Sequence, residues 1–396
     1  MSSDINTATR AVRAAIESDT QHGAVVPPLH LSSNFAFAGF GEKRQYDYTR
    51  SGNPTRDALA DALSDLEGGA GAVVTSSGMA ALTLVTHLLK PGDLLVAPHD
   101  CYGGTYRLFD ALARKGQFDI AFVDQSDVAA LDAACADKPA LILVETPSNP
   151  LLRIVDVESI AERARACGAL LAVDNTFLSP ALQQPIALGA DLVIHSTTKY
   201  INGHSDVVGG CVVAATEDLA EQLCWWANCL GITGAPFDSF LTLRGIRTLH
   251  VRLREHEAGA SLLANLLDQH AGVQRVYYPG LATHPGHDIA SRQQSGFGGM
   301  LSFEIDGDET AVRTFLESLE YFSLAESLGG VESLVCHPAS MTHAAVTPEA
   351  LATAGVGQNL IRLSVGLENP EDLVADILRA LELAGKARVP ERAAVA

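Results

Sequence analysis

ADLVIHSTTKYINGHSD, residues 190–206, is the stretch that decides the fold. Its apolar run over residues 191–195 predicts a buried strand, after which the chain becomes polar and reaches Lys199. A second apolar run, residues 169–174, ends on Asp174. Each strand therefore places a charged side chain near its carboxyl end, and that is where ligands bind in parallel sheets.

A lysine and an aspartate in these places are the two charged groups that a pyridoxal phosphate site requires. The amine of Lys199 would form a Schiff base with the cofactor aldehyde, and the carboxylate of Asp174 would keep the ring nitrogen protonated. The alternatives are a surface lysine in a loop and an aspartate that caps a turn or helix. We favour the cofactor site, because partial desolvation directly after a buried strand makes an amine a better nucleophile.

Apolar runs alternate with helical patterns through the middle of the chain. One helix is predicted over residues 78–89 and ends before Pro91 and Gly92. Another is predicted from the N-cap Asp156 to Gly168. Continuous apolar strands that alternate with helices indicate a mostly parallel sheet with helices on both faces, and hence the α/β class. The predicted strands are residues 72–75, 93–97, 119–123, 140–145, 169–174, 191–195 and 210–214.

The pattern changes after about residue 255, where an α+β domain is predicted. The first 60 residues are rich in Pro, Gly, Ser and Tyr and predict little regular structure. We therefore expect an N-terminal arm (1–60) that contacts another subunit, a large cofactor-binding domain (61–255) and a small C-terminal domain (256–396). The elements predicted around and beyond residue 255 are helices 241–267, 309–319 and 370–383 and strands 299–305 and 360–364.

Composition narrows the class of protein. The 396 residues include 47 acidic and 27 basic side chains, a net charge of −20 that opposes binding to nucleic acid or anionic membranes. No apolar run approaches the roughly 20 residues of a membrane span, and the first twenty residues lack an apolar signal core. Seven cysteines without a C-x-x-C pair indicate reduced thiols. These features predict a cytoplasmic protein whose anionic ligands need local cations or amides.

A phosphate site is predicted between the strand that ends at Thr75 and the helix that begins at Gly78. A helix N-terminus offers unpaired N–H groups and a positive dipole end, and glycine lets the backbone approach closely. A simple turn is the alternative. The hydroxyls of Ser196 and Thr198, beside Lys199, favour the phosphate interpretation.

Two further side chains are candidates for ligand contacts. Tyr102 follows the strand that ends near Ala97 and could stack on a planar ring, although a tyrosine that covers loop backbone is equally expected. Arg362 lies inside an apolar strand, where it needs a partner such as a substrate carboxylate. An internal salt bridge is the alternative for Arg362.

Other chemistries have weaker support. His204, Ser205 and Asp206 are the residue types of a hydrolase triad, but adjacent residues in one loop cannot adopt its geometry. We expect no metal site, because the remaining candidate histidines lie in loops without a matched set of cysteines or carboxylates. These histidines are His284, His287, His337 and His343.

With these parts assembled, the sequence resembles the Cys/Met-metabolism family of pyridoxal-phosphate enzymes, and within it most closely the bacterial cystathionine γ-synthases. The resemblance covers nearly the whole chain, and its strings are long and specific. They are residues 26–28, 48–55, 67–72, 93–110, 145–150, 174–177, 190–206, 225–228 and 324–330.

The resemblance implies a fold-type I subunit, like that of aspartate aminotransferase, in a homotetramer with active sites at a dimer interface. It implies that Lys199 bonds to the cofactor, Asp174 pairs with its ring nitrogen and Tyr102 stacks on the ring and assists proton transfer. It also implies three groups of binding residues: Gly78, Met79, Ser196 and Thr198 for the phosphate; Tyr48 and Arg50 for the phosphate of the neighbouring subunit; and Arg362, Asn149 and Ser327 for the substrate α-carboxylate.

The activity that the resemblance implies is γ-replacement in methionine biosynthesis, in which O-succinylhomoserine and cysteine give cystathionine and succinate. Arg107 is our candidate for binding the succinyl carboxylate, with a surface or inter-subunit salt bridge as the alternative. Cystathionine γ-lyase is the nearest rival activity, and Asp47 together with the Trp225-Trp226 pair favours the synthase. A DNA-binding regulator is disfavoured, because the acidic chain has no basic patch.

Overall fold

The computed structural model describes residues 5–342 and 355–387. The chain packs as two units. The first comprises Met1–Pro98, Gly104–Glu145 and Asp156–Val251, and the second comprises His99–Gly103, Thr146–Val155 and Arg252–Ala396. The division into arm, large domain and small domain stays a prediction. No helix in the described ranges is long and apolar enough to cross a membrane.

A mixed sheet forms the centre of the first unit. In the described residues its strand order is β1-β7-β6-β5-β4-β2-β3, and only β7 runs antiparallel to its neighbours. The predicted strands are confirmed to within one residue at each end. Their bounds are β1 Gly71–Thr75, β2 Leu94–Pro98, β3 Asp119–Val123, β4 Leu141–Glu145, β5 Leu170–Asp174, β6 Leu192–His195 and β7 Gly210–Ala214.

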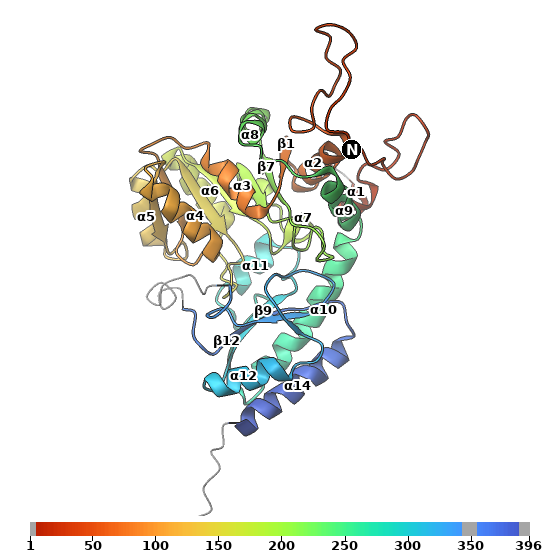
Figure 1. Cartoon of the computed structure of the whole chain (residues 1–396). Coiled ribbons are helices and arrows are strands. Elements are labelled where there is room, and N and C mark those ends of the chain that lie inside the picture. The colour runs from red at the N-terminus through yellow and green to blue at the C-terminus, as the bar shows by residue number, and fades with distance from the viewer. Residues whose placement is uncertain (1–4, 343–354, 388–396) are drawn as a thin grey trace, which may run out of the picture. The chain divides into compact units, whose positions relative to one another are not determined.

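Helices cover both faces of this sheet (Figure 1). On one face α3, α4 and α8 pack on strand residues such as Ile194, and on the other α1, α2 and α9 pack on residues such as Val193. Alternation along β6 produces this division, because successive side chains of a strand point to opposite faces. The helices of the unit are α1 Thr7–Arg13, α2 Pro54–Glu67, α3 Gly78–Thr86, α4 Gly103–Arg114, α5 Val128–Ala136, α6 Val157–Cys167, α7 Ser179–Leu182, the 3₁₀-helix η1 Pro185–Leu188, α8 Glu217–Leu230 and α9 Pro236–Ile246.

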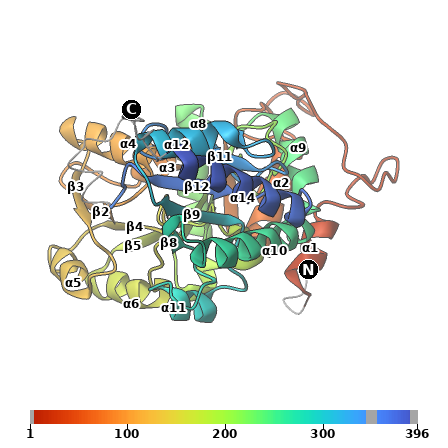
Figure 2. The same ribbon diagram turned by 90° about the horizontal axis from the view of Figure 1, so that it is seen from below.

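The second unit is the predicted α+β arrangement. Its sheet has the order β10-β11-β12-β9-β8 in the described residues, and α10, α12 and α14 share one apolar core with it (Figure 2). The bounds are α10 Leu249–Asp268, β8 Val273–Tyr277, α11 His287–Gln293, β9 Met300–Ile305, α12 Glu309–Ser318, β10 Ser323–Leu324, β11 Leu334–Cys336, β12 Leu360–Ser364 and α14 Pro370–Ala387.

Two helix predictions need correction, the helix predicted over 370–383 extends to Ala387, and the N-terminal segment contains helix. The helix predicted to reach residue 89 ends at Thr86, because the next three amides bond to carbonyls three residues back and tighten the chain. The single helix predicted over 241–267 is divided into α9 and α10 at Arg247 and Thr248. The first 60 residues contain α1 and the start of α2, whereas little regular structure was predicted there.

Candidate active site

Lys199 lies in a backbone loop that directly follows β6. The Lys199 amide donates to the Ser196 carbonyl at 3.2 Å, and the Gly203 amide donates to the Lys199 carbonyl at 2.8 Å. The residue is half-buried. The loop is therefore held at the carboxyl end of β6, where the sequence predicted the lysine.

Asp174 ends the neighbouring strand, β5. It pairs in register with Glu145 of β4 and Ile194 of β6. Burial raises the pKa of Asp174, while hydrogen bonds from Thr176 and the charge of His195 act in the opposite direction. A cation beside this carboxylate would favour its ionised form, so the site suits a protonated ring nitrogen.

The predicted phosphate site lies at the N-terminus of α3. The Ser77 side chain caps the helix by accepting the Ala80 amide at 3.1 Å, and the first turn contains no acidic residue. As the first helical residues, Gly78 and Met79 have N–H groups without an intrahelical acceptor. A Cβ added to Gly78 would lie 2.8 Å from the Ser196 Cβ, so the absence of a side chain brings α3 against the segment that carries Lys199. These features fit a phosphate.

Replacing Gly78 with alanine should weaken pyridoxal phosphate binding about tenfold, since overpacking of this kind typically costs about 1–3 kcal/mol. Cofactor titration of the apoprotein measures the effect. Gly385→Ala in α14 is the matched control, because a Cβ there would have no atom within 4 Å. Equal cofactor affinity in the two variants would contradict the phosphate site.

The Thr198 hydroxyl bonds to the backbone of Gly209. It donates to the Gly209 carbonyl at 3.2 Å and accepts the Gly209 amide at 3.0 Å. The hydroxyl thus joins the lysine loop to the segment before β7. Its contact with phosphate stays a prediction.

The second unit contains the predicted carboxylate-binding arginine. Arg362 of β12 is buried, and its guanidinium donates to Asn149 Oδ1 at 2.8 Å and to the Ser327 carbonyl at 2.9 Å. Its Nε is buried without a hydrogen-bond partner in the part of the chain that the structure describes. Within the same residues it forms no salt bridge, so the internal ion pair considered from the sequence is not present there.

Backbone strain marks the same place. Ser327 has a φ of 94°, a conformation that residues other than glycine rarely adopt. Such strain persists where the surroundings over-determine the backbone, and it clusters at ligand sites. The structure thus brings together Arg362, Asn149 and Ser327, which the sequence grouped as a carboxylate site.

The remaining predicted residues are more exposed. Tyr102 belongs to the second unit and is 38% exposed, and Arg107 is exposed on α4, without an ion pair among the described residues. In the arm, Arg50 donates to the Asn228 carbonyl at 2.7 Å and lies 5.7 Å from the ring centre of Tyr48. The roles assigned to these four residues stay predictions.

Thr176 is a residue that the sequence analysis missed. Its hydroxyl accepts the Ser196 amide at 2.9 Å, and its amide donates to Asp174 Oδ1 at 3.0 Å. It therefore joins the end of β5, which carries Asp174, to the lysine segment. Its position two residues after Asp174, at the end of a buried strand, was the available signal.

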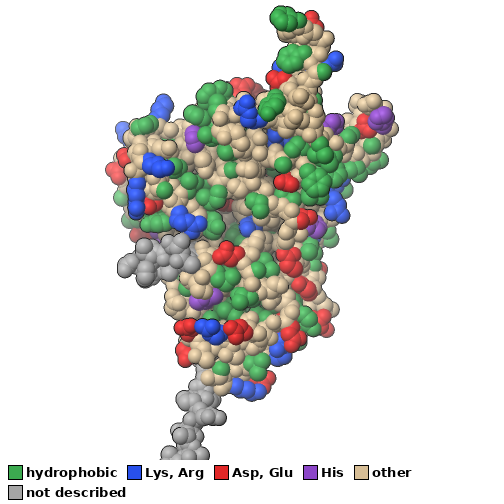
Figure 3. All heavy atoms as spheres, in the orientation of Figure 1, with side chains coloured by type: hydrophobic (Ala, Val, Ile, Leu, Met, Phe, Trp, Pro, Cys, Tyr) green, Lys and Arg blue, Asp and Glu red, His purple; other side chains and the backbone are tan. Residues whose placement is uncertain are grey.

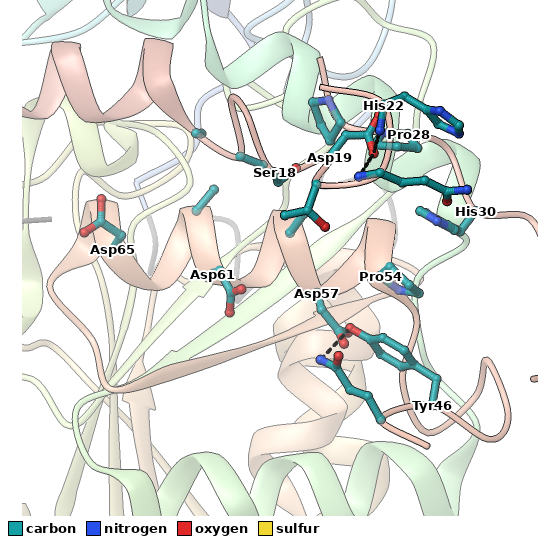
Figure 4. A pocket seen from close by; sticks show the side chains of 18 of the residues that line it. Ser18, Asp19, His22, Pro28, His30, Tyr46, Pro54, Asp57, Asp61 and Asp65 are labelled. Carbon is teal, nitrogen blue, oxygen red and sulfur yellow. Dashed lines mark hydrogen bonds between the residues drawn. The ribbon is translucent and has the colours of Figure 1, made fainter. Parts of the chain in front are cut away.

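A cavity of about 860 Å³ lies between the arm and α2, and none of the site residues named above lines it (Figure 4). Asp57, Asp61 and Asp65 line it from successive turns of α2, and Asp19 lines it from the arm. Burial and the charge of Asp57 raise the pKa of Asp61. This concentration of carboxylates disfavours an anionic phosphate there.

Among the residues described, no group of three or more His, Cys, Asp or Glu side chains is arranged to hold a metal ion. His343 lies outside the described residues.

Comparison with known proteins identifies the family. Residues 8–382 match the family described as Cys/Met metabolism PLP-dependent enzyme. The chain belongs to this family. It is therefore a pyridoxal-phosphate-dependent enzyme with the fold-type I architecture predicted from its sequence.

Two relatives and one solved structure illustrate the similarity. The cystathionine γ-synthase of Escherichia coli (strain K12) is 58% identical, over 96% of this chain and 98% of that protein. The crystal structure of cystathionine γ-synthase from Xanthomonas oryzae pv. oryzae in complex with aminoacrylate and cysteine has 62% identity and a TM-score of 0.96, over 97% of this chain and 99% of that one. A cystathionine γ-lyase from Dictyostelium discoideum is 46% identical, over 94% of this chain and 97% of that protein.

Proposed function

We propose that this enzyme is a cystathionine γ-synthase, which joins O-succinylhomoserine to cysteine and releases succinate. The single observation that carries the proposal is the buried arginine Arg362, which has no ion pair among the described residues and is suited to an amino-acid carboxylate. High identity to named γ-synthases over nearly the full chain supports the choice of reaction within the family.

Lys199 is the proposed base and acid. Bound pyridoxal phosphate supplies an aldehyde for the amines of Lys199 and the substrate, and a ring that takes up electrons. The Lys199 Nζ would take the proton from Cα and, after giving that proton up, one from Cβ as succinate leaves Cγ. Once the cysteine thiol has added to Cγ and lost its proton, the same amine would return a proton to Cβ and then one to Cα. One amine that serves in both directions must lie within hydrogen-bond reach of both carbons.

The other proposed residues bind and orient. Asp174 would hold a proton on the ring nitrogen, and Arg362 with Asn149 and Ser327 would hold the substrate α-carboxylate. Gly78, Met79, Ser196 and Thr198 would bind the phosphate. Tyr102 would stack on the ring and assist proton transfer.

Arg107→Ala should weaken use of O-succinylhomoserine about tenfold more than use of O-acetylhomoserine, because only the succinyl ester carries a second carboxylate. Steady-state kcat/KM for both esters measures the difference. Arg114→Ala is the matched control, since it removes a charge from the same helix at a residue paired with Asp110 at 2.9 Å. Equal losses for the two esters would refute the role of Arg107.

We also propose that the enzyme is cytoplasmic and forms a homotetramer. In this tetramer the arm would carry Tyr48 and Arg50 to the cofactor phosphate of a neighbouring copy. Apolar side chains are exposed on the arm (Figure 3), among them Leu31, Phe37 and Phe40. Exposed apolar groups of this kind mark protein interaction surfaces.

Replacing Phe37 and Phe40 together with serine should shift the protein towards smaller species. Sedimentation measures the change. A variant in which the exposed residues Trp225 and Leu378 are both replaced with serine is the control for a general loss of apolar surface. An unchanged sedimentation coefficient in the arm variant would contradict the arm's role.

Incubation with O-succinyl- and O-acetylhomoserine, each with and without cysteine, tests the proposed reaction. Cystathionine formed from an ester and cysteine supports the synthase. Efficient production of cysteine and ketobutyrate from cystathionine, with little cystathionine made from the esters, would instead identify a γ-lyase, the activity named for the Dictyostelium relative.

A further inference from the structure

Glu67 and His195 form a buried pair that the proposed mechanism does not use. Glu67 is the last residue of α2 and His195 the last residue of β6. Their side chains are 0% exposed, and His195 Nε2 lies 2.7 Å from Glu67 Oε1. An ionisable pair this deeply buried is costly to place in a protein interior.

The same carboxylate oxygen also holds the residue after Asp174. Asn175 Nδ2 donates to Glu67 Oε1 at 2.9 Å and to the Gln183 carbonyl at 2.8 Å. Gln183 Nε2 returns a hydrogen bond to Asn175 Oδ1 at 3.1 Å. One oxygen of Glu67 thus ties the end of β5 to the end of β6.

At the ends of β5 and β6, the face of the sheet opposite to Glu67 and His195 carries Asp174. Asp174 is in register with Ile194, so its side chain lies on the opposite face of the sheet from His195. Thr176 then links Asp174 to Ser196 by the two hydrogen bonds described above. Glu67 holds the strand ends from one face, while Asp174 and Ser196 are presented at the other.

The pair is not fully satisfied. Glu67 Oε2 and His195 Nδ1 are buried without a hydrogen-bond partner within the residues that the structure describes. Buried polar atoms in native proteins are nearly always paired, so these two atoms are a cost that the fold carries at the ends of β5 and β6.

We propose that Glu67 and His195 are positioning residues, which hold the ends of β5 and β6 so that Asp174 meets the ring nitrogen of the cofactor. The inference rests on the role of Asp174 proposed above. In addition, a protonated His195 would lower the pKa of Asp174, against the larger effect of burial.

The test compares His195→Gln, which keeps a side-chain donor for Glu67, with His195→Leu, which removes it. Asp174→Asn is the reference for the site. Asp376→Asn is the control for lost stability, because Asp376 is a buried carboxylate that accepts the backbone amides of Glu320 and Tyr321 in the second unit. Each holoenzyme is measured for its pyridoxal phosphate dissociation constant, for the pH titration of the cofactor's visible absorbance, and for its melting temperature.

We expect His195→Leu to raise the cofactor dissociation constant about tenfold and to displace the pH titration, and His195→Gln to restore both to near the wild-type values. Asp376→Asn should lower only the melting temperature. Should His195→Leu fail to fold, Glu67→Gln replaces it, with the same expected direction.

Two results overturn the proposal in different ways. If Asp174→Asn alters both cofactor measurements while His195→Leu and Glu67→Gln alter only the melting temperature, the positioning role is wrong and the role of Asp174 stands. If Asp174→Asn alters neither cofactor measurement, the proposed role of Asp174 fails and this inference fails with it.

Discussion

Lys199→Ala should lower turnover about ten-thousand-fold, since the Lys199 amine is the base and acid at both substrate carbons in the proposed mechanism. The visible absorbance of the Schiff base between this amine and the cofactor should disappear as well, because no other side chain at the end of β6 offers an amine. Steady-state turnover and an absorbance spectrum of the purified variant measure the two effects.

Lys138→Ala provides the control for this variant. Lys138 follows α5 at the surface of the same unit, so the substitution removes an amine without touching the site. Wild-type turnover in Lys199→Ala, or equal losses in both variants, would rule out the assignment of Lys199.

Arg362→Lys should lower kcat/KM roughly 100-fold while leaving cofactor binding unchanged. Lysine keeps the positive charge but cannot form two parallel hydrogen bonds to a carboxylate, and the loss of such charge-assisted contacts costs roughly 3 kcal/mol. The Asn149 side chain and the Ser327 carbonyl would also lose the hydrogen bonds that the Arg362 guanidinium donates to them. The decrease should appear mainly in KM, because the arginine binds the substrate before and during the reaction.

Arg379→Lys is a suitable comparison for Arg362→Lys. Arg379, also in the second unit, donates to the Asp376 carboxylate and to the Ser318 carbonyl. Unlike Arg362, it thereby forms an internal ion pair. A cofactor defect in Arg362→Lys, or an unchanged KM, would argue that Arg362 supports the fold and does not bind substrate.

Local patterns predicted most of the fold. The central apolar strands β4, β6 and β7 were identified because each is buried on both faces, which makes its sequence continuously apolar. The start of α2 was missed although its signals were present: Asn53 accepts the amides of Thr55 and Arg56, Pro54 occupies the first turn, and Gly68 ends the helix at a φ of 76°. The richness of the arm in Pro and Gly concealed these caps.

The sequence predicted those site residues that directly follow or end an apolar strand. Lys199 and Asp174 were identified in this way, and the structure places both at the ends of adjacent strands. The contacts of Arg362 with Asn149 and of Glu67 with His195 join residues far apart in the chain. The Glu67–His195 pair was missed because a single sequence gives no register between α2 and β6.

The central claim is that the amine of residue 199 holds the cofactor. Borohydride reduction of the holoenzyme followed by peptide mapping tests it most directly, because reduction makes the attachment permanent. We predict the pyridoxyl group on the peptide that contains Lys199. Attachment at another lysine, such as Lys90 or Lys138, with Lys199 unmodified, would contradict it.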